Sequence, residues 1–191
     1  MLKNLLKNPF FPERTSVKGV YRFTKAFLET DEQFALDAEI KRNRDLGLPV
    51  RELIDRLHSM CRTEVVVVEN IVPTVGRTMI ANNLTDTTPD NVMYVKKVAL
   101  GSGTNTPANG DTTLQTETYR NDVASRTNAS NIGYVTGFFS ATEVSGTFRE
   151  AGLFSDGTAS ANTGILVSRV AINITKSLSE SLTIDWTLTI S

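Results

Sequence analysis

The sequence predicts a mainly β protein, an antiparallel β-sandwich of jelly-roll-like type that carries an N-terminal helical arm. Only three threonines precede residue 61, whereas 22 follow it. Eleven of the 20 Lys and Arg residues lie before residue 61. Threonine favours strands, and the Gly, Asn and Ser clusters of the later part favour turns. We therefore expect a helical docking arm over residues 1–62 and a β-sandwich domain over residues 63–191.

The arm is predicted to begin with irregular chain and to continue as a first helix. Two prolines limit helix formation within residues 1–19. Thr30 is a predicted N-cap, and Gln33 stands three residues later, at the position of a capping-box partner. Gly47 suits the end of this helix because glycine readily adopts the positive φ of a C-terminal cap.

A second helix is predicted from Pro49, a residue that suits the first turn. Apolar residues then recur at spacings of three and four, at Val50, Leu53, Ile54 and Leu57. Each helix offers one narrow apolar stripe, so we expect the arm to pack on a partner or on the β-domain. The apolar residues expected in this docking interface are Leu2, Leu5, Leu6, Phe10, Phe11, Phe34, Leu53 and Leu57.

Strands of the β-domain are expected where apolar runs lie between turn-rich loops. Four consecutive valines within residues 63–69 favour a buried strand. Residues 71–84 are ambiguous, because their apolar residues fit a helical face while Gly76 disfavours a helix. Trp186 is in phase with the apolar residues of the last strand and is expected in the core. The other predicted strands span residues 92–100, 131–142, 147–154, 164–175 and 182–190.

The run Gly101-Ser102-Gly103 suggests a phosphate-binding loop, but its surroundings favour a connection between strands. A P-loop has a lysine after its last glycine, and none follows here. A dinucleotide-binding fingerprint opens a helix, which Pro107 and the Asn109-Gly110 pair do not. We therefore expect Gly101 and Gly103 to serve the backbone of a structural loop, and we expect no cofactor.

The charged residues of the β-domain suggest ion pairs rather than a metal site. The acidic residues between positions 111 and 122 lack the dense, alternating oxygen ligands of a calcium loop. Asp111 is expected to cap a turn, and Glu117 is expected to pair with Arg120. Glu150 precedes an apolar strand segment, and Arg169 of another predicted strand is its expected partner. If buried, such a pair costs about 3–5 kcal/mol when one member is removed.

Catalysis, nucleic-acid binding and membrane insertion are not expected. His58 is the only histidine and Cys61 the only cysteine. Triads and histidine-rich metal sites therefore lack their residues. The net charge of −1 gives no overall attraction for nucleic acid or anionic lipid, and no apolar run approaches the roughly 20 residues of a membrane span.

An ordered set of short segments resembles a family of tailed-bacteriophage virion proteins. The resemblance covers about residues 65–191 and implies a β-rich module of tail-fibre, baseplate, collar or head-decoration proteins, without catalytic residues. The segments are Val75-Gly76-Arg77 with Ile80-Ala81, Val98 to Thr104 with Pro107, Asp111, Leu114, Glu117 and Arg120, Glu150 to Phe154, Gly164 to Arg169, Lys176, and Leu182 to Ile190.

The expected function is that of a non-enzymatic structural component of a tailed-phage virion, associated with the tail, collar or fibre and assembled in the host cytoplasm. Its expected partners are other virion proteins and further copies of itself. One alternative is a capsid decoration protein. Another is a fibre module that binds a host glycan or receptor through residues 104–113 or 156–163. A glycan depolymerase needs two carboxylates facing one cleft, and the sequence offers no candidate pair.

Overall fold

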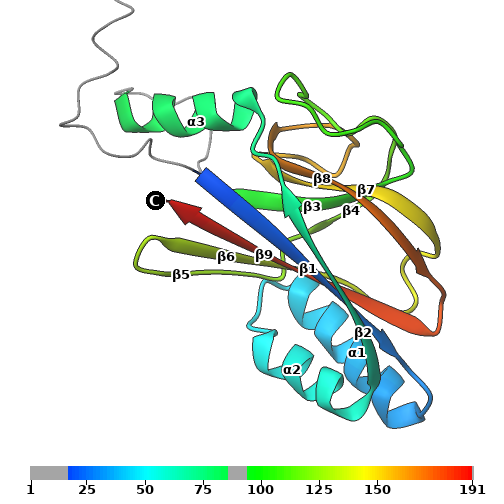
Figure 1. Cartoon of the computed structure of the whole chain (residues 1–191). Helices are drawn as coiled ribbons and strands as arrows, with labels where there is room; N and C mark the ends of the chain where they lie inside the picture. Colours follow the sequence, from blue (N-terminus) through cyan, green and yellow to red (C-terminus); the bar gives the residue numbers. More distant parts are fainter. Residues whose placement is uncertain (1–16, 86–93, 191) are drawn as a thin grey trace, which may run out of the picture.

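Two antiparallel sheets form a β-sandwich in the computed structural model, which describes residues 17–85 and 94–190 (Figure 1). The five-stranded sheet has the order β2-β1-β9-β6-β5, and the four-stranded sheet has the order β4-β3-β7-β8. This architecture confirms the predicted fold class. In chain order the elements are β1 (Val17–Phe27), α1 (Asp31–Asp45), α2 (Arg51–Met60), β2 (Arg62–Asn70), α3 (Thr74–Thr85), β3 (Val95–Gly101), β4 (Glu117–Asp122), β5 (Ser125–Ala129), β6 (Ile132–Phe139), β7 (Gly146–Ser155), β8 (Ile165–Lys176) and β9 (Glu180–Ile190).

The main core lies between the facing surfaces of the two sheets. Trp186 is 3% exposed and packs near Tyr21, so its predicted place in the core is confirmed. Alternate residues of the central strands enter this core, as the period of two in an extended chain requires. Buried aromatic and aliphatic side chains from both sheets fill it, among them Tyr21, Phe23, Val98, Leu100, Phe139, Leu153, Val170 and Ile184.

The N-terminal part contains the two predicted helices but also a strand, β1, that the sequence does not predict. β1 lies inside the five-stranded sheet, between β2 and β9, and pairs with β9 along its whole length and with β2 from Gly19 onward. Lysine and arginine alternate with its buried aromatic residues, and this charge conceals the strand pattern. The prediction of irregular chain up to residue 19 is therefore wrong from Val17 onward. The predicted interface residues Leu2, Leu5, Leu6, Phe10 and Phe11 lie outside the described residues.

Helices α1 and α2 cover part of the outer face of the five-stranded sheet. The capping box of Thr30 and Gln33 is present, and Gly47 follows α1 with a φ of 69°. Pro49 precedes the N-cap of α2 and so stands just before the first turn. Leu57 is fully buried in a cluster around Phe138, so the apolar stripe packs on the sandwich itself.

The other two predicted interface residues of the helices are less buried. Leu53 is partly buried against the same cluster around Phe138, and Phe34 is 37% exposed.

The segment of residues 71–84, ambiguous from its sequence, forms α3 at the opposite end of the molecule (Figure 1). Gly76 lets this helix approach the backbone of β8, because a Cβ there would lie 3.0 Å from the carbonyl oxygens of Leu166 and Val167.

The prediction of a buried strand at residues 63–69 is wrong as to burial. The four valines lie in β2, which is an edge strand, and Val67 is 61% exposed. A continuous apolar run is typical of a strand covered on both faces, but nothing in the run itself distinguishes a covered strand from an uncovered one. β4 and β5 are strands that the sequence did not predict, since polar residues dominate both.

Candidate functional site

The loop of residues 102–116, between β3 and β4, folds back over the outer face of the four-stranded sheet. Its Leu114 is buried against Ala99, Phe154 and Leu166 on that face. Gly152 makes room for the leucine, since a Cβ there would lie 2.9 Å from its Cδ2. The outer face, which faces solvent in many antiparallel sheets, is dry beneath this loop.

Glu150 lies beneath the loop and is fully buried. Its Oε1 accepts hydrogen bonds from the backbone amides of Gly103, at 3.1 Å, and Thr116, at 2.7 Å. Its Oε2 accepts one from the amide of Gln115 at 3.0 Å. One carboxylate therefore binds both ends of the loop, and bonds from backbone amides to a charged acceptor are stronger than those between neutral groups.

Arg169 completes this buried network, as the sequence predicted. Its Nη2 and Nε donate to Oε2 of Glu150 at 2.8 and 3.1 Å. Its Nη1 donates to Asp111 at 2.6 Å, and the side chain of Arg169 is 3% exposed. Asp111 also caps the turn by accepting from the amide of Ala108 at 2.8 Å, as expected. The two acidic side chains and the one arginine together tie β7 and β8 to the loop.

Glycine is required at both ends of the run Gly101-Ser102-Gly103, because Glu150 occupies the space that a side chain would need. A Cβ at Gly101 would lie 2.6 Å from Oε1 of Glu150 and 2.5 Å from the carbonyl oxygen of Thr116. A Cβ at Gly103 would overlap the same carboxylate oxygen. The predicted structural role of this run is thus a close approach of backbone to a buried carboxylate.

Glu117 and Arg120 form the second predicted ion pair. Nε and Nη2 of the arginine donate to the two carboxylate oxygens at 2.5 and 2.7 Å, and both side chains are buried. Arg120 also donates to the carbonyl oxygens of Thr158 and Thr163 at 3.1 Å and lies over the ring of Phe154. The pair therefore fixes the loop between β7 and β8. The structure brings all seven predicted motif residues together on one face of the four-stranded sheet, in two buried networks: Gly101, Gly103, Asp111, Glu117, Arg120, Glu150 and Arg169.

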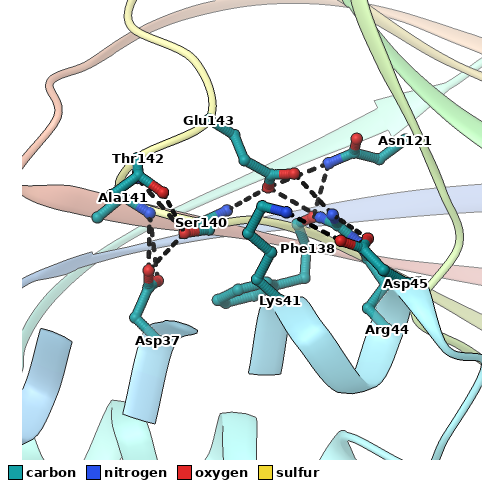
Figure 2. Close-up of polar contacts among 10 residues, drawn as sticks. All are labelled: Asp37, Lys41, Arg44, Asp45, Asn121, Phe138, Ser140, Ala141, Thr142 and Glu143. Atoms are coloured by element: carbon teal, nitrogen blue, oxygen red, sulfur yellow. Dashed lines mark hydrogen bonds and ion pairs between the residues drawn. The ribbon is translucent and has the colours of Figure 1, made fainter. Parts of the chain in front are cut away.

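A further buried network, which sequence reasoning missed, joins α1 to the connection between β6 and β7 (Figure 2). Arg44 donates to Oε1 and Oε2 of Glu143 at 2.6 and 2.8 Å and to the carbonyl oxygen of Phe138 at 2.7 Å. Burial opposes the charge on Arg44, but the hydrogen bonds to Glu143 and Asp45 outweigh it and raise the pKa of the guanidinium. This bidentate pair clamps the helix to the sandwich.

Asp37 and Lys176 extend the same network. Asp37 accepts from Ser140 Oγ at 2.5 Å and from the amide of Ala141 at 3.0 Å, and its burial raises its pKa above the ordinary value. Lys176 is 1% exposed, and its Nζ donates to the carbonyl oxygen of Val144 at 2.8 Å. Burial lowers the pKa of Lys176 to about 8, although nearby carboxylates oppose the shift. Arg44 and Glu143 are 99 positions apart, so no local sequence pattern signals this network.

An open groove of about 720 Å³ lies between the α1–α2 connection and strands β5, β6 and β9. Asp185 lines it and accepts from Arg51 Nη1 at 2.7 Å and from Thr136 Oγ1 at 2.8 Å. Tyr134 is 39% exposed beside it. Arg126, also in the lining, donates to the carbonyl oxygen of Val95 at 2.9 Å. The groove offers an aromatic ring, hydroxyls and one carboxylate to a ligand.

His58 and Cys61 lie apart from these networks. His58 Nε2 contacts Thr183 Oγ1 at 3.0 Å, and burial lowers the pKa of the imidazole. Burial also raises the pKa of the Cys61 thiol, which disfavours the reactive thiolate. Within residues 17–85 and 94–190, no group of His, Cys, Asp or Glu has an arrangement that could hold a metal ion. Among these residues no helix has the length and apolar character needed to cross a membrane.

Comparison of the chain with protein-family models, with curated proteins and with solved structures found no match. The functional conclusion therefore depends on the sequence and the geometry of the chain itself.

Proposed function

We propose that this chain is a non-enzymatic structural component of a tailed-phage virion, as the sequence resemblance implies. The contacts that Glu150 makes with the loop of residues 102–116 support this role most directly. The fully buried carboxylate of Glu150 accepts hydrogen bonds from three backbone amides and pairs with one arginine. These contacts hold the loop of residues 102–116 in one shape. A fixed loop on a β-sandwich presents a constant surface, which repeated contacts in an assembly require.

The experiment for this proposal is immunogold labelling of purified phage particles with an antibody raised against the recombinant chain. Particles from a lysate of the phage that encodes the chain are expected to carry the label at one repeated position. Mass spectrometry of the same particles is expected to find the chain at a stoichiometry comparable to other virion proteins. Absence of the chain from purified particles would contradict the proposal.

The N-terminal segment keeps its proposed role in docking, with a revised boundary. Because β1 lies inside the five-stranded sheet, removal of residues 1–30 would destroy the sandwich. Removal of residues 1–16 leaves every described strand intact. We expect the shortened chain to keep its melting temperature and to be lost from particles. Normal incorporation of the shortened chain would show that residues 1–16 do not dock.

A second candidate function is binding of a host surface glycan, and we propose the groove as its site. The loops of residues 104–113 and 156–163 that the sequence suggested are less suited. Their Asp111, Thr158 and Thr163 already accept hydrogen bonds from arginines of the chain itself. Tyr134 instead exposes an aromatic ring of the kind on which a sugar face packs. A glycan array tests this candidate, and binding is expected to be lost in Tyr134→Ala. Phe34→Ala is the control, because Phe34 is an exposed aromatic residue outside the groove lining, and this variant is expected to keep binding. An array on which the unmodified chain binds no glycan would reject the candidate.

A further inference from the structure

The described strands leave four sheet edges, and three of them are protected against pairing with another chain. β5 is short, with five residues, and it is polar. β4 carries charges and has a register shift against β3. β8 is covered by α3 and by an antiparallel bridge from Ile71, whose amide donates to the carbonyl oxygen of Arg169 at 3.2 Å. Shortness, charge, irregularity and cover are the usual means by which an edge avoids unwanted pairing.

The edge strand β2 is neither short nor irregular, and its charged residues, Arg62, Glu64 and Glu69, leave the four valines between them uncharged. It is nine residues long, and its register against β1 is continuous from Asn70 to Arg62, without a bulge. It contains neither proline nor lysine. Val65, Val66 and Val67 are 44%, 46% and 61% exposed, on both faces of the sheet. An edge that is long, regular, β-branched and apolar is a template for another strand.

The core of the sandwich also reaches the surface at this edge. A cavity of about 100 Å³ opens beside Val66, lined by the apolar Phe23, Ile174 and Leu182 and by polar residues that include Lys25 and Glu64. The three apolar side chains belong to the buried core. A strand added to β2 would extend the sheet past this opening and remove apolar surface from water.

We propose that β2 is the interface between two copies of this chain, which pair antiparallel about a two-fold axis and join their five-stranded sheets into one. Two-fold pairing of one strand with itself is necessarily antiparallel in a sheet, and it closes the assembly at two subunits. The charges of β2 are compatible with a second copy, because Arg62 and Glu64 at its start and Glu69 near its end can all avoid a like charge in antiparallel pairing. This dimer does not depend on a place in a virion.

The valines fix the register of the pair. With the axis at Val66, that residue faces itself, and Val65 faces Val67, so that the three most exposed valines of the strand pair with one another. Arg62 then faces Asn70, and Glu69 faces Thr63, so no two like charges are opposite. An axis at Glu64 would instead oppose two carboxylates, which destabilises a pair.

Sedimentation of the purified full-length chain tests the proposal. The unmodified chain is expected to sediment as a dimer, and Val66→Lys to sediment as a monomer over the same concentrations, because two ammonium groups would meet on the axis. Asn128→Lys, on the edge strand β5, is the matched control and is expected to remain dimeric. Thermal melting checks that the variants fold. A monomeric unmodified chain, or a Val66→Lys variant that still dimerises, would overturn the proposal.

Cysteine cross-linking tests the register separately from the association. In a Cys61→Ala background, Val66→Cys is expected to form a disulfide-linked dimer under mild oxidation, since residue 66 faces its own copy. Val67→Cys is the control: its two copies are offset by two positions, beyond the roughly 7 Å between Cα atoms that a disulfide spans. Cross-linking of Val67→Cys alone, or of neither variant, would refute the assigned pairing.

Discussion

Replacement of Glu150 by glutamine is the most direct test of the buried network beneath the loop of residues 102–116. The carboxylate is fully buried, and each of its oxygens accepts at least two hydrogen bonds. Glutamine has nearly the same shape but only one accepting oxygen. Whichever way its amide is turned, the NH₂ group faces donors, either from Gly103 and Thr116 or from Gln115 and Arg169.

The expected cost follows from the loss of the buried negative charge. Arg169 keeps Asp111 as a partner but loses the carboxylate that is nearest to its Nε. Removal of one member of a buried pair costs about 3–5 kcal/mol. For a chain of 191 residues this corresponds to a fall of about 6–20 °C in melting temperature, at roughly 2–4 °C per kcal/mol.

The assay is thermal and urea unfolding of the purified full-length chain and of two comparison variants. Glu32→Gln makes the same chemical change in an exposed pair with Arg56, and its effect is expected to stay within about 1 kcal/mol. The double variant Glu150→Gln with Arg169→Met is expected to lose less stability than the sum of the single losses, because the two residues share one network. A loss below about 1 kcal/mol for Glu150→Gln would refute the reasoning.

Two further predictions concern the glycine run and the buried lysine. Gly103→Ala is expected to destabilise the fold by about 1–3 kcal/mol, because its Cβ would overlap Glu150, whereas Gly110→Ala has open space and is expected to be neutral; equal effects in urea unfolding would contradict the steric explanation. Because the pKa of Lys176 falls to about 8 in the folded chain from an ordinary 10.5, the unfolded chain binds more protons between these values, and the free energy of unfolding should rise with pH across that window. Urea unfolding at pH 7.5 and 9.5 should show a smaller rise in Lys176→Met, and an identical rise in both proteins would contradict the shift.

Several features of this protein follow from the sequence by itself because they depend on neighbours along the chain. The capping box of Thr30 and Gln33 needs only a spacing of three residues. The alternation of β9 needs only a period of two, and it places Trp186 in the core. The pair of Glu117 and Arg120 joins residues three positions apart. The pairing of Glu150 with Arg169 was also predictable, since β7 and β8 are consecutive strands joined by one loop.

Other features were decided only by the tertiary structure, because they depend on which surfaces remain uncovered and which distant charges share a dry site. The valines of β2 carry the pattern of a covered strand, and only the strand order shows that they form an edge. Arg44 and Glu143 are 99 positions apart, and no local period relates them. Glu150 lies beneath the loop of residues 102–116 rather than between the sheets. That loop lies on the outer face because its Leu114 packs there. Local patterns thus predicted the type of the elements with a clear apolar period, but not of the polar strands β4 and β5, and long-range packing set the environment of the charges.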